Sequence, residues 1–150
     1  MIKLVRTNSD NPDFINLVDE LDAYLKVSDG DEHEFYNQYN NLDVIKHTIV
    51  AYLNNQPAGC GALKIFDTHS IEIKRMFTKS NARGHGIATK ILQELEDWAK
   101  ELNYQSCILE TGTRQIEAIG LYKKNKYQLI PNYGPYINAV NSLCFKKIIS

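Results

Sequence analysis

A glycine-containing segment, Arg83-Gly84-His85-Gly86-Ile87-Ala88, stands between a predicted strand and a long predicted helix. The first turn of a helix leaves several backbone N–H groups without partners and carries the positive end of the helix dipole. Gly84 and Gly86 can adopt unusual backbone angles and let an anion's oxygens approach the backbone closely. Arg83 and the hydroxyl of Thr89 could add side-chain contacts. The segment therefore predicts an anion site of the kind that binds phosphate.

The same spacing has other interpretations. An isolated Gly-x-Gly can simply make a tight connection between a strand and a helix. A Walker-type loop needs Lys followed by Ser or Thr after its last glycine, whereas Gly86 is followed by Ile-Ala-Thr. A Rossmann fingerprint needs a third glycine in a first βαβ unit, and this segment lies past the middle of the chain. Nucleoside triphosphate and dinucleotide binding are therefore both disfavoured.

The elements before the segment are predicted by periodicity. Residues 2–7 alternate as a strand, and Asn11-Pro12 begins a helix whose apolar stripe ends near residues 28–30. Three strands with short turns follow, which implies an antiparallel meander. These strands are residues 48–53, 58–66 and 70–78. The polar stretch 31–43 has no clean period, so a short helix and a loop both stay open.

After the segment, a helical stripe runs from Ile87 and is closed by Asn103. A nearly all-apolar strand at 106–111 is expected to be central in the sheet. A further helix and two closing strands follow at residues 114–125, 127–130 and 141–148. The order is strand, one or two helices, three strands, helix, strand, helix and two strands. It predicts one α/β domain over residues 1–150, with a mixed, mostly antiparallel central sheet flanked by helices.

In two places the sequence resembles the GCN5-related N-acetyltransferase (GNAT) family, and its bacterial branch in particular. Arg83, Gly86 and Ala88 match the family's pyrophosphate pattern of Arg or Gln, two residues, Gly, one residue, then Gly or Ala. Ala118 and Tyr122 match its Ala-x-x-x-Tyr helix near the C-terminus. The resemblance implies a single-domain GNAT-like fold, with acetyl-CoA as co-substrate and a small-molecule amine as its partner in the reaction.

The resemblance is specific from about Ser70 to Tyr127, and it has two departures. Gln115 stands where many members have Asn, so a contact to the coenzyme could be lost or made by the longer amide. Lys126 stands where many members have Gly. Either Lys126 takes a left-handed conformation itself, or the helix ends differently with Asn125 in the strained position.

Implied coenzyme contacts come from the strand before the loop, from the loop and from the following helix. The residues expected to bind the coenzyme are Met76, Phe77, Thr78, Arg83, Gly84, His85, Gly86, Ile87, Ala88, Thr89 and Gln115. The resemblance also implies direct attack by a neutral amine, with backbone N–H groups of the strand holding the thioester carbonyl. Tyr122 matches the family's proton donor to the departing thiolate, and a phenol with a pKa of about 10 can fill that role at neutral pH. The alternative for Tyr122 is a ring that only packs in the core.

Two carboxylates are candidates for the general base that takes the amine's proton, directly or through a water. Glu72 lies in the strand before the loop and is placed ahead of Glu110, which ends the central strand. Each could instead be a salt-bridging strand residue, with Lys74 available to Glu72. His85 is expected to face solvent or phosphate rather than to act as the base.

Two arginines are candidates for binding the acceptor. If the sheet splays as in this family, Arg75 and Arg114 both border the acceptor cleft and favour an amine that also carries a carboxylate, such as an amino acid. Ion pairs with Glu72 or Glu110 are the alternative. Tyr133 and Tyr136 could form a wall of the acceptor site or close a loop over the core.

Composition excludes several other classes. A net charge of −1 shows no excess of positive charge of the kind that binds nucleic acid or an anionic membrane. Three widely spaced cysteines indicate buried thiols rather than a disulfide framework or a zinc site, and the histidines have no metal-binding spacing. The N-terminus turns polar too early for a signal peptide, so a cytoplasmic location is the default expectation. A homodimer through the C-terminal strands is permitted but not required.

Two further functions stay open beside the small-molecule acetyltransferase. One is a non-catalytic module that senses acetyl-CoA. The other is an enzyme that acetylates the N-terminus or a lysine of a protein or peptide. Retention of Tyr122 and of a carboxylate at position 72 or 110 favours an enzyme, because a sensor could dispense with all of them.

Overall fold

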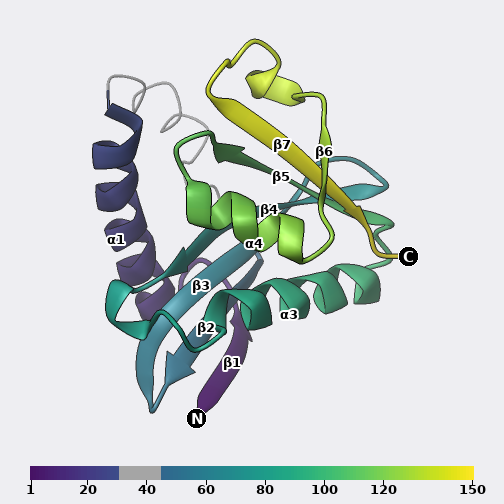
Figure 1. Cartoon of the computed structure of the whole chain (residues 1–150). Coiled ribbons are helices and arrows are strands. Elements are labelled where there is room, and N and C mark those ends of the chain that lie inside the picture. The colour runs from purple at the N-terminus through teal and green to yellow at the C-terminus, as the bar shows by residue number, and fades with distance from the viewer. Residues whose placement is uncertain (31–44) are drawn as a thin grey trace.

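The computed structural model describes residues 1–30 and 45–150. Its centre is a seven-stranded sheet in the order β1-β2-β3-β4-β5-β7-β6, in which β4 and β5 are parallel and all other neighbours antiparallel (Figure 1). The strands are β1 (Ile2–Thr7), β2 (His47–Leu53), β3 (Gln56–Ile65), β4 (Ser70–Thr78), β5 (Ser106–Gly112), β6 (Gln128–Ile130) and β7 (Ser142–Ile148). The predicted mixed, mostly antiparallel sheet is confirmed.

Three α-helices lie in the described part of the chain: α1 (Pro12–Asp29), α3 (Ile87–Glu101) and α4 (Ile116–Lys124). Two short 3₁₀ turns, η2 (Ser80–Ala82) and η3 (Gly134–Tyr136), complete the helical elements there. The stretch 31–43, for which a helix and a loop both stayed open, lies outside the described residues. No helix that the structure describes is long and apolar enough to cross a membrane.

Local sequence explains where α1 begins and which face it buries. The Asn11 side chain accepts hydrogen bonds from the N–H groups of Asp13 and Phe14 at 2.9 and 3.1 Å, and Pro12 occupies the first turn. Phe14 and Leu17 are fully buried and pack with residues of β2 and β3 in one core cluster. Helix α1 therefore covers one face of the sheet.

Helix α3 covers the opposite face, and two glycines of β3 let it approach closely. A Cβ on Gly61 would lie 2.8 Å from Ile91 Cγ2 of α3 and 2.7 Å from Met76 Sδ of β4. A Cβ on Gly59 would lie 2.7 Å from the Phe77 carbonyl oxygen. No real Cβ has room at such distances. The start of α3 is therefore seated directly on β3 and β4.

Two expectations about individual residues are settled by the fold. Lys126 adopts φ 73° after α4, whereas Asn125 stays at φ −92°, so Lys126 itself takes the left-handed conformation. Cys60, Cys107 and Cys144 are free and buried, as predicted. Burial raises the pKa of the Cys60 and Cys107 thiols to about 12, which keeps both unreactive at neutral pH.

Candidate functional site

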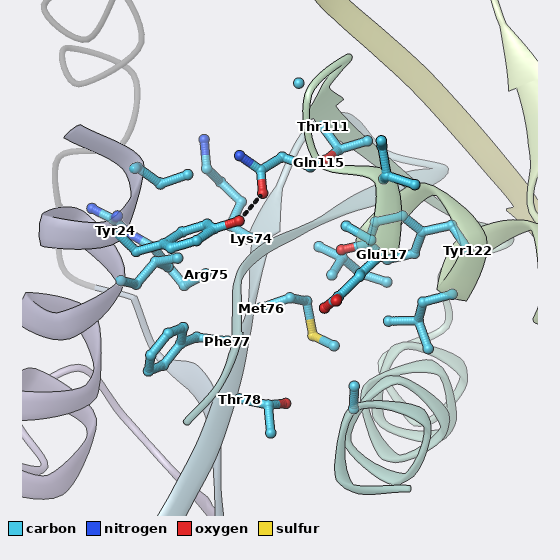
Figure 2. A pocket seen from close by; sticks show the side chains of 18 of the residues that line it. Tyr24, Lys74, Arg75, Met76, Phe77, Thr78, Thr111, Gln115, Glu117 and Tyr122 are labelled. Carbon is cyan, nitrogen blue, oxygen red and sulfur yellow. Dashed lines mark hydrogen bonds between the residues drawn. The ribbon is translucent and has the colours of Figure 1, made fainter. Parts of the chain in front are cut away.

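The site is a cavity that opens where two neighbouring strands separate. Strands β4 and β5 pair only from Ser70 to Glu72 on β4, and the register contains no later pair between them in the described chain. Beyond this point lies a cavity of about 770 Å³ bordered by β4, β5, α1, α3 and α4 (Figure 2). Backbone groups of β4 that would otherwise bond to β5 therefore face the cavity.

A bulge in β4 aims its residues into this opening. Ala62 of β3 is opposite Lys74, but Cys60 is opposite Phe77, so β4 carries one extra residue here, and Arg75 has a φ of 60°. Arg75 contacts α1 and Phe77 belongs to the core cluster beneath α1, whereas Met76 packs with the cluster beneath α3. The bulge thus reverses the alternation of side chains and places Met76, Phe77 and Thr78 along the cavity wall.

The predicted anion loop forms one end of the cavity. Gly84 and Gly86 adopt φ values of 85° and 73°, and a Cβ on either would meet nothing within 4 Å, so their backbone angles rather than crowding require glycine. Gly86 is the N-cap of α3, which has no side-chain cap. The N–H groups of the first turn are therefore available to an anion. Arg83, Gly84, Gly86, Ile87, Ala88 and Thr89 line the cavity; exposed His85 is not among its lining residues.

An acidic residue that the sequence did not single out faces this loop. Arg83 Nη1 lies 3.4 Å from Glu117 Oε2, with the side chains 49% and 83% exposed. Figure 2 shows the Glu117 carboxylate directed into the space between β4 and α4. Glu117 is in the first turn of α4, where a carboxylate also suits the helix dipole. Only the packing of α4 beside α3 reveals that it reaches the loop.

Tyr122 of α4 lines the cavity from the α3 side and is also part of the core. Its residue is 5% exposed, and its ring centroid lies 5.8 Å from that of Tyr127 in an edge-on arrangement. Burial, and secondarily the Glu110 carboxylate, raise the pKa of Tyr122 above its ordinary value. The phenol therefore keeps its proton at neutral pH and can donate it.

Both predicted carboxylates line the same cavity, each held by a hydroxyl group. The Tyr133 hydroxyl donates to Glu72 Oε2 at 2.6 Å, and the Ser142 hydroxyl donates to Glu110 Oε2 at 2.7 Å. Burial and the Glu72 charge raise the pKa of Tyr133, so this phenol stays a donor. Tyr136 lines the cavity itself, whereas Tyr133 is not among the lining residues.

Both predicted substrate-binding arginines contact α1. Arg75 Nη1 lies 2.7 Å from Asp22 Oδ1, and its side chain is 4% exposed. Arg114 Nη1 donates to the Ser28 carbonyl oxygen at 2.8 Å. Their partners are therefore on α1 and are neither of the two acids that the sequence offered. A substrate-binding role for either arginine stays a prediction.

Gln115 joins the same helix from the loop before α4. Its amide nitrogen donates to Ser28 Oγ at 2.6 Å, and its amide oxygen accepts from the Tyr24 hydroxyl at 3.0 Å (Figure 2). The amide thus connects the loop before α4 to α1 beside the cavity. Among residues 1–30 and 45–150 no group of three or more His, Cys, Asp or Glu is placed to hold a metal ion.

Known proteins similar to this chain include acetyltransferases. The model of the acetyltransferase (GNAT) family matches residues 14–127. The IAA acetyltransferase of Azospirillum brasilense is 33% identical over 129 residues, which is 81% of each chain. A solved structure from Klebsiella pneumoniae, assigned as an acyl-CoA N-acyltransferase, has a TM-score of 0.84 at 26% identity and covers 100% of this chain and 99% of its own.

A GNAT acetyltransferase from Elizabethkingia anophelis, solved with acetyl-CoA bound, has a TM-score of 0.69 at 18% identity, covering 98% of this chain and 97% of its own. At that identity the likeness concerns the fold. The α/β fold expected from the two sequence motifs is therefore confirmed.

Proposed function

Because the chain belongs to the GNAT acetyltransferase family, we propose that it transfers the acetyl group of acetyl-CoA to a primary amine of a small molecule, amino acids included. The amine attacks the thioester directly. The observation that carries this proposal is the position of the polar groups on both sides of the gap between β4 and β5. Glu72 and Glu110 lie on the α1 side, and Tyr122 lies on the α3 side.

The anion loop supports acetyl-CoA as the donor. The coenzyme's pyrophosphate would bind the uncapped first turn of α3, with Arg83 as a nearby countercharge. From there the cavity leads along β4 past Met76 to the gap. A thioester in the gap would have backbone N–H groups of β4 beside its carbonyl oxygen.

This arrangement provides a base for the proton of the amine and a proton donor for the thiolate. The neutral amine attacks the carbonyl carbon from the α1 side, and the carbon–sulfur bond breaks. Tyr122 gives its proton to the departing thiolate sulfur, while Glu72 or Glu110, directly or through water, takes a proton from the amine. The amine then loses its proton on one face of the sheet, and the thiolate receives a proton on the other.

Thiol release from acetyl-CoA tests the proposal, with amines, amino acids and peptides as acceptors. We expect turnover with a small-molecule amine, and a loss of kcat of about 100-fold or more in Tyr122→Phe, because proton transfer by a positioned group contributes at least that much. Coenzyme affinity should be unchanged, since only a hydroxyl group is removed.

Two outcomes would contradict the proposal. Coenzyme binding without turnover of any acceptor would favour an acetyl-CoA sensor. Turnover of peptides alone would favour a protein N-acetyltransferase.

A further inference from the structure

Glu72 stands where the cavity begins. It is opposite Ile108 in the last pair that the β4–β5 register contains in the described chain, so the sheet fixes its backbone. Its side chain lines the cavity on a flexible stem, whose torsions the sheet does not fix. A general base must lie within hydrogen-bond reach of the proton that it takes. A carboxylate in this place therefore works best with a partner that sets its direction.

The Tyr133 hydroxyl is such a partner. It donates to Glu72 Oε2 at 2.6 Å, a short distance typical of a hydrogen bond between a hydroxyl group and a carboxylate. Burial, and then the charge of Glu72, raise the pKa of Tyr133, so the phenol keeps the proton that it donates. The other carboxylate oxygen, Oε1, lies 4.0 Å from Lys74 Nζ. Tyr133 is not among the described residues that line the cavity, so its hydroxyl acts on the site through Glu72.

The ring of Tyr133 is itself held by packing. Its centroid lies 5.1 Å from that of Phe66 and 6.0 Å from that of Tyr136, both in edge-on arrangements. The loop around it is tied together by Asn132, whose amide nitrogen donates to three carbonyl oxygens of the same loop at 3.0, 3.2 and 3.1 Å. Contacts within the protein alone therefore fix the hydroxyl, as the support of a catalytic group requires.

We propose that Tyr133 is a positioning residue for acetyl transfer, which holds the Glu72 carboxylate so that Glu72 takes the proton of the attacking amine. The inference rests on the proposed function and selects between its two candidate bases. Glu110, the other candidate, is held from the same loop by Ser142. A proton moves from the amine nitrogen to Glu72, directly or through water, and the phenol of Tyr133 keeps its own proton throughout. Tyr133 thus differs from Tyr122, which gives its proton to the thiolate.

The pH profile of kcat/KM tests this role in Tyr133→Phe, which keeps the ring and loses the hydroxyl. A carboxylate that has lost a donated hydrogen bond binds a proton more tightly, so kcat/KM should begin to fall at a higher pH on acidification. We expect the acidic limb to move up by about one pH unit, because a hydrogen bond to a charged group corresponds to roughly that difference. The acceptor's own titration is the same for both proteins and cancels in the comparison. On the plateau, kcat should fall about tenfold, because the base is less well placed.

A double-mutant cycle with Glu72→Gln shows whether Tyr133 acts through Glu72. Glutamine keeps an oxygen that accepts the phenol's hydrogen bond but cannot take the amine's proton, so Glu72→Gln alone should lower kcat about 100-fold or more. Adding Tyr133→Phe to this variant should change kcat by less than about twofold, because residues that act as a unit are not additive. A further tenfold loss in the Glu72→Gln background would make the role of Tyr133 merely structural and overturn the inference.

Tyr52→Phe is the matched control. The Tyr52 hydroxyl also donates to a carboxylate at 2.6 Å, that of Asp13, and Tyr52 is not among the described residues that line the cavity. Loss of this hydroxyl should leave the acidic limb in place. A limb that stays in place in Tyr133→Phe, or moves equally in Tyr52→Phe, would overturn the positioning role and leave acetyl transfer standing. No turnover with any acceptor would instead overturn the proposed enzyme, and the role of Tyr133 with it.

Discussion

Replacing Glu117 with Gln should strengthen coenzyme binding. Arg83 lies 3.4 Å from the Glu117 carboxylate, so a pyrophosphate that bound Arg83 would compete with this ion pair. The pair is largely exposed, and exposed pairs contribute about 0.2–1 kcal/mol. Release of Arg83 therefore corresponds to roughly 1.4- to 5-fold in the dissociation constant. Removing a negative charge beside the bound pyrophosphate acts in the same direction, so we expect a value near the upper end.

Calorimetric titration with coenzyme A at low and high salt measures this effect. The gain should shrink as salt rises, because exposed charges are screened over a Debye length of about 10 Å at 0.1 M. Asp97→Asn is the control, since Asp97 is an exposed acid of α3 well away from the loop and the charge change is identical. Weaker coenzyme binding in Glu117→Gln would refute the competition and would instead make Glu117 a contributor to the site.

Two other predictions concern the stability of the scaffold. The Tyr127 hydroxyl donates at 2.9 Å to Glu96, a buried carboxylate that also accepts from Lys147 at 2.7 Å, so Tyr127→Phe should lower the free energy of unfolding by about 1–3 kcal/mol. Urea denaturation checks this, and a loss below about 0.5 kcal/mol, the size usual for neutral surface changes, would contradict it. Burial lowers the pKa of His47 below 6.5, so the unfolded chain binds that proton more tightly than the folded protein. Stability should therefore fall as the pH drops through about 6.5, and His47→Gln should flatten this part of the curve; an equally steep fall in the variant would assign it to other groups.

Most elements were predictable because their signals are local. The predicted strand 70–78 and the helix beginning at Pro12 agree with the structure, since a turn or a cap marks each boundary in the sequence itself. The bulge at Arg75 was not predictable in the same way. It lies beside Gly61 of the neighbouring strand, where a Cβ would meet Met76 and Ile91 of α3. A single strand's sequence does not contain that information.

The residues of the site, too, were predictable only where their signal is local in the sequence. The anion loop was visible because it combines glycines with a helix start in one short segment, and Tyr122 was visible through the family motif. Glu117 was missed, because its contact with Arg83 depends on the placement of α4.

The contacts of the two arginines indicate what sets the width of the cavity. Arg75 ties β4 to the middle of α1, while Arg114 and Gln115 tie the loop after β5 to the end of the same helix. Strands β4 and β5 no longer bond to each other there, so α1 connects the two sides of the gap. A guanidinium group suits this task, since it donates in fixed directions to a carboxylate or a helix carbonyl. The arrangement therefore holds the two strands apart where the cavity lies, through contacts that come from α1 rather than from the sheet.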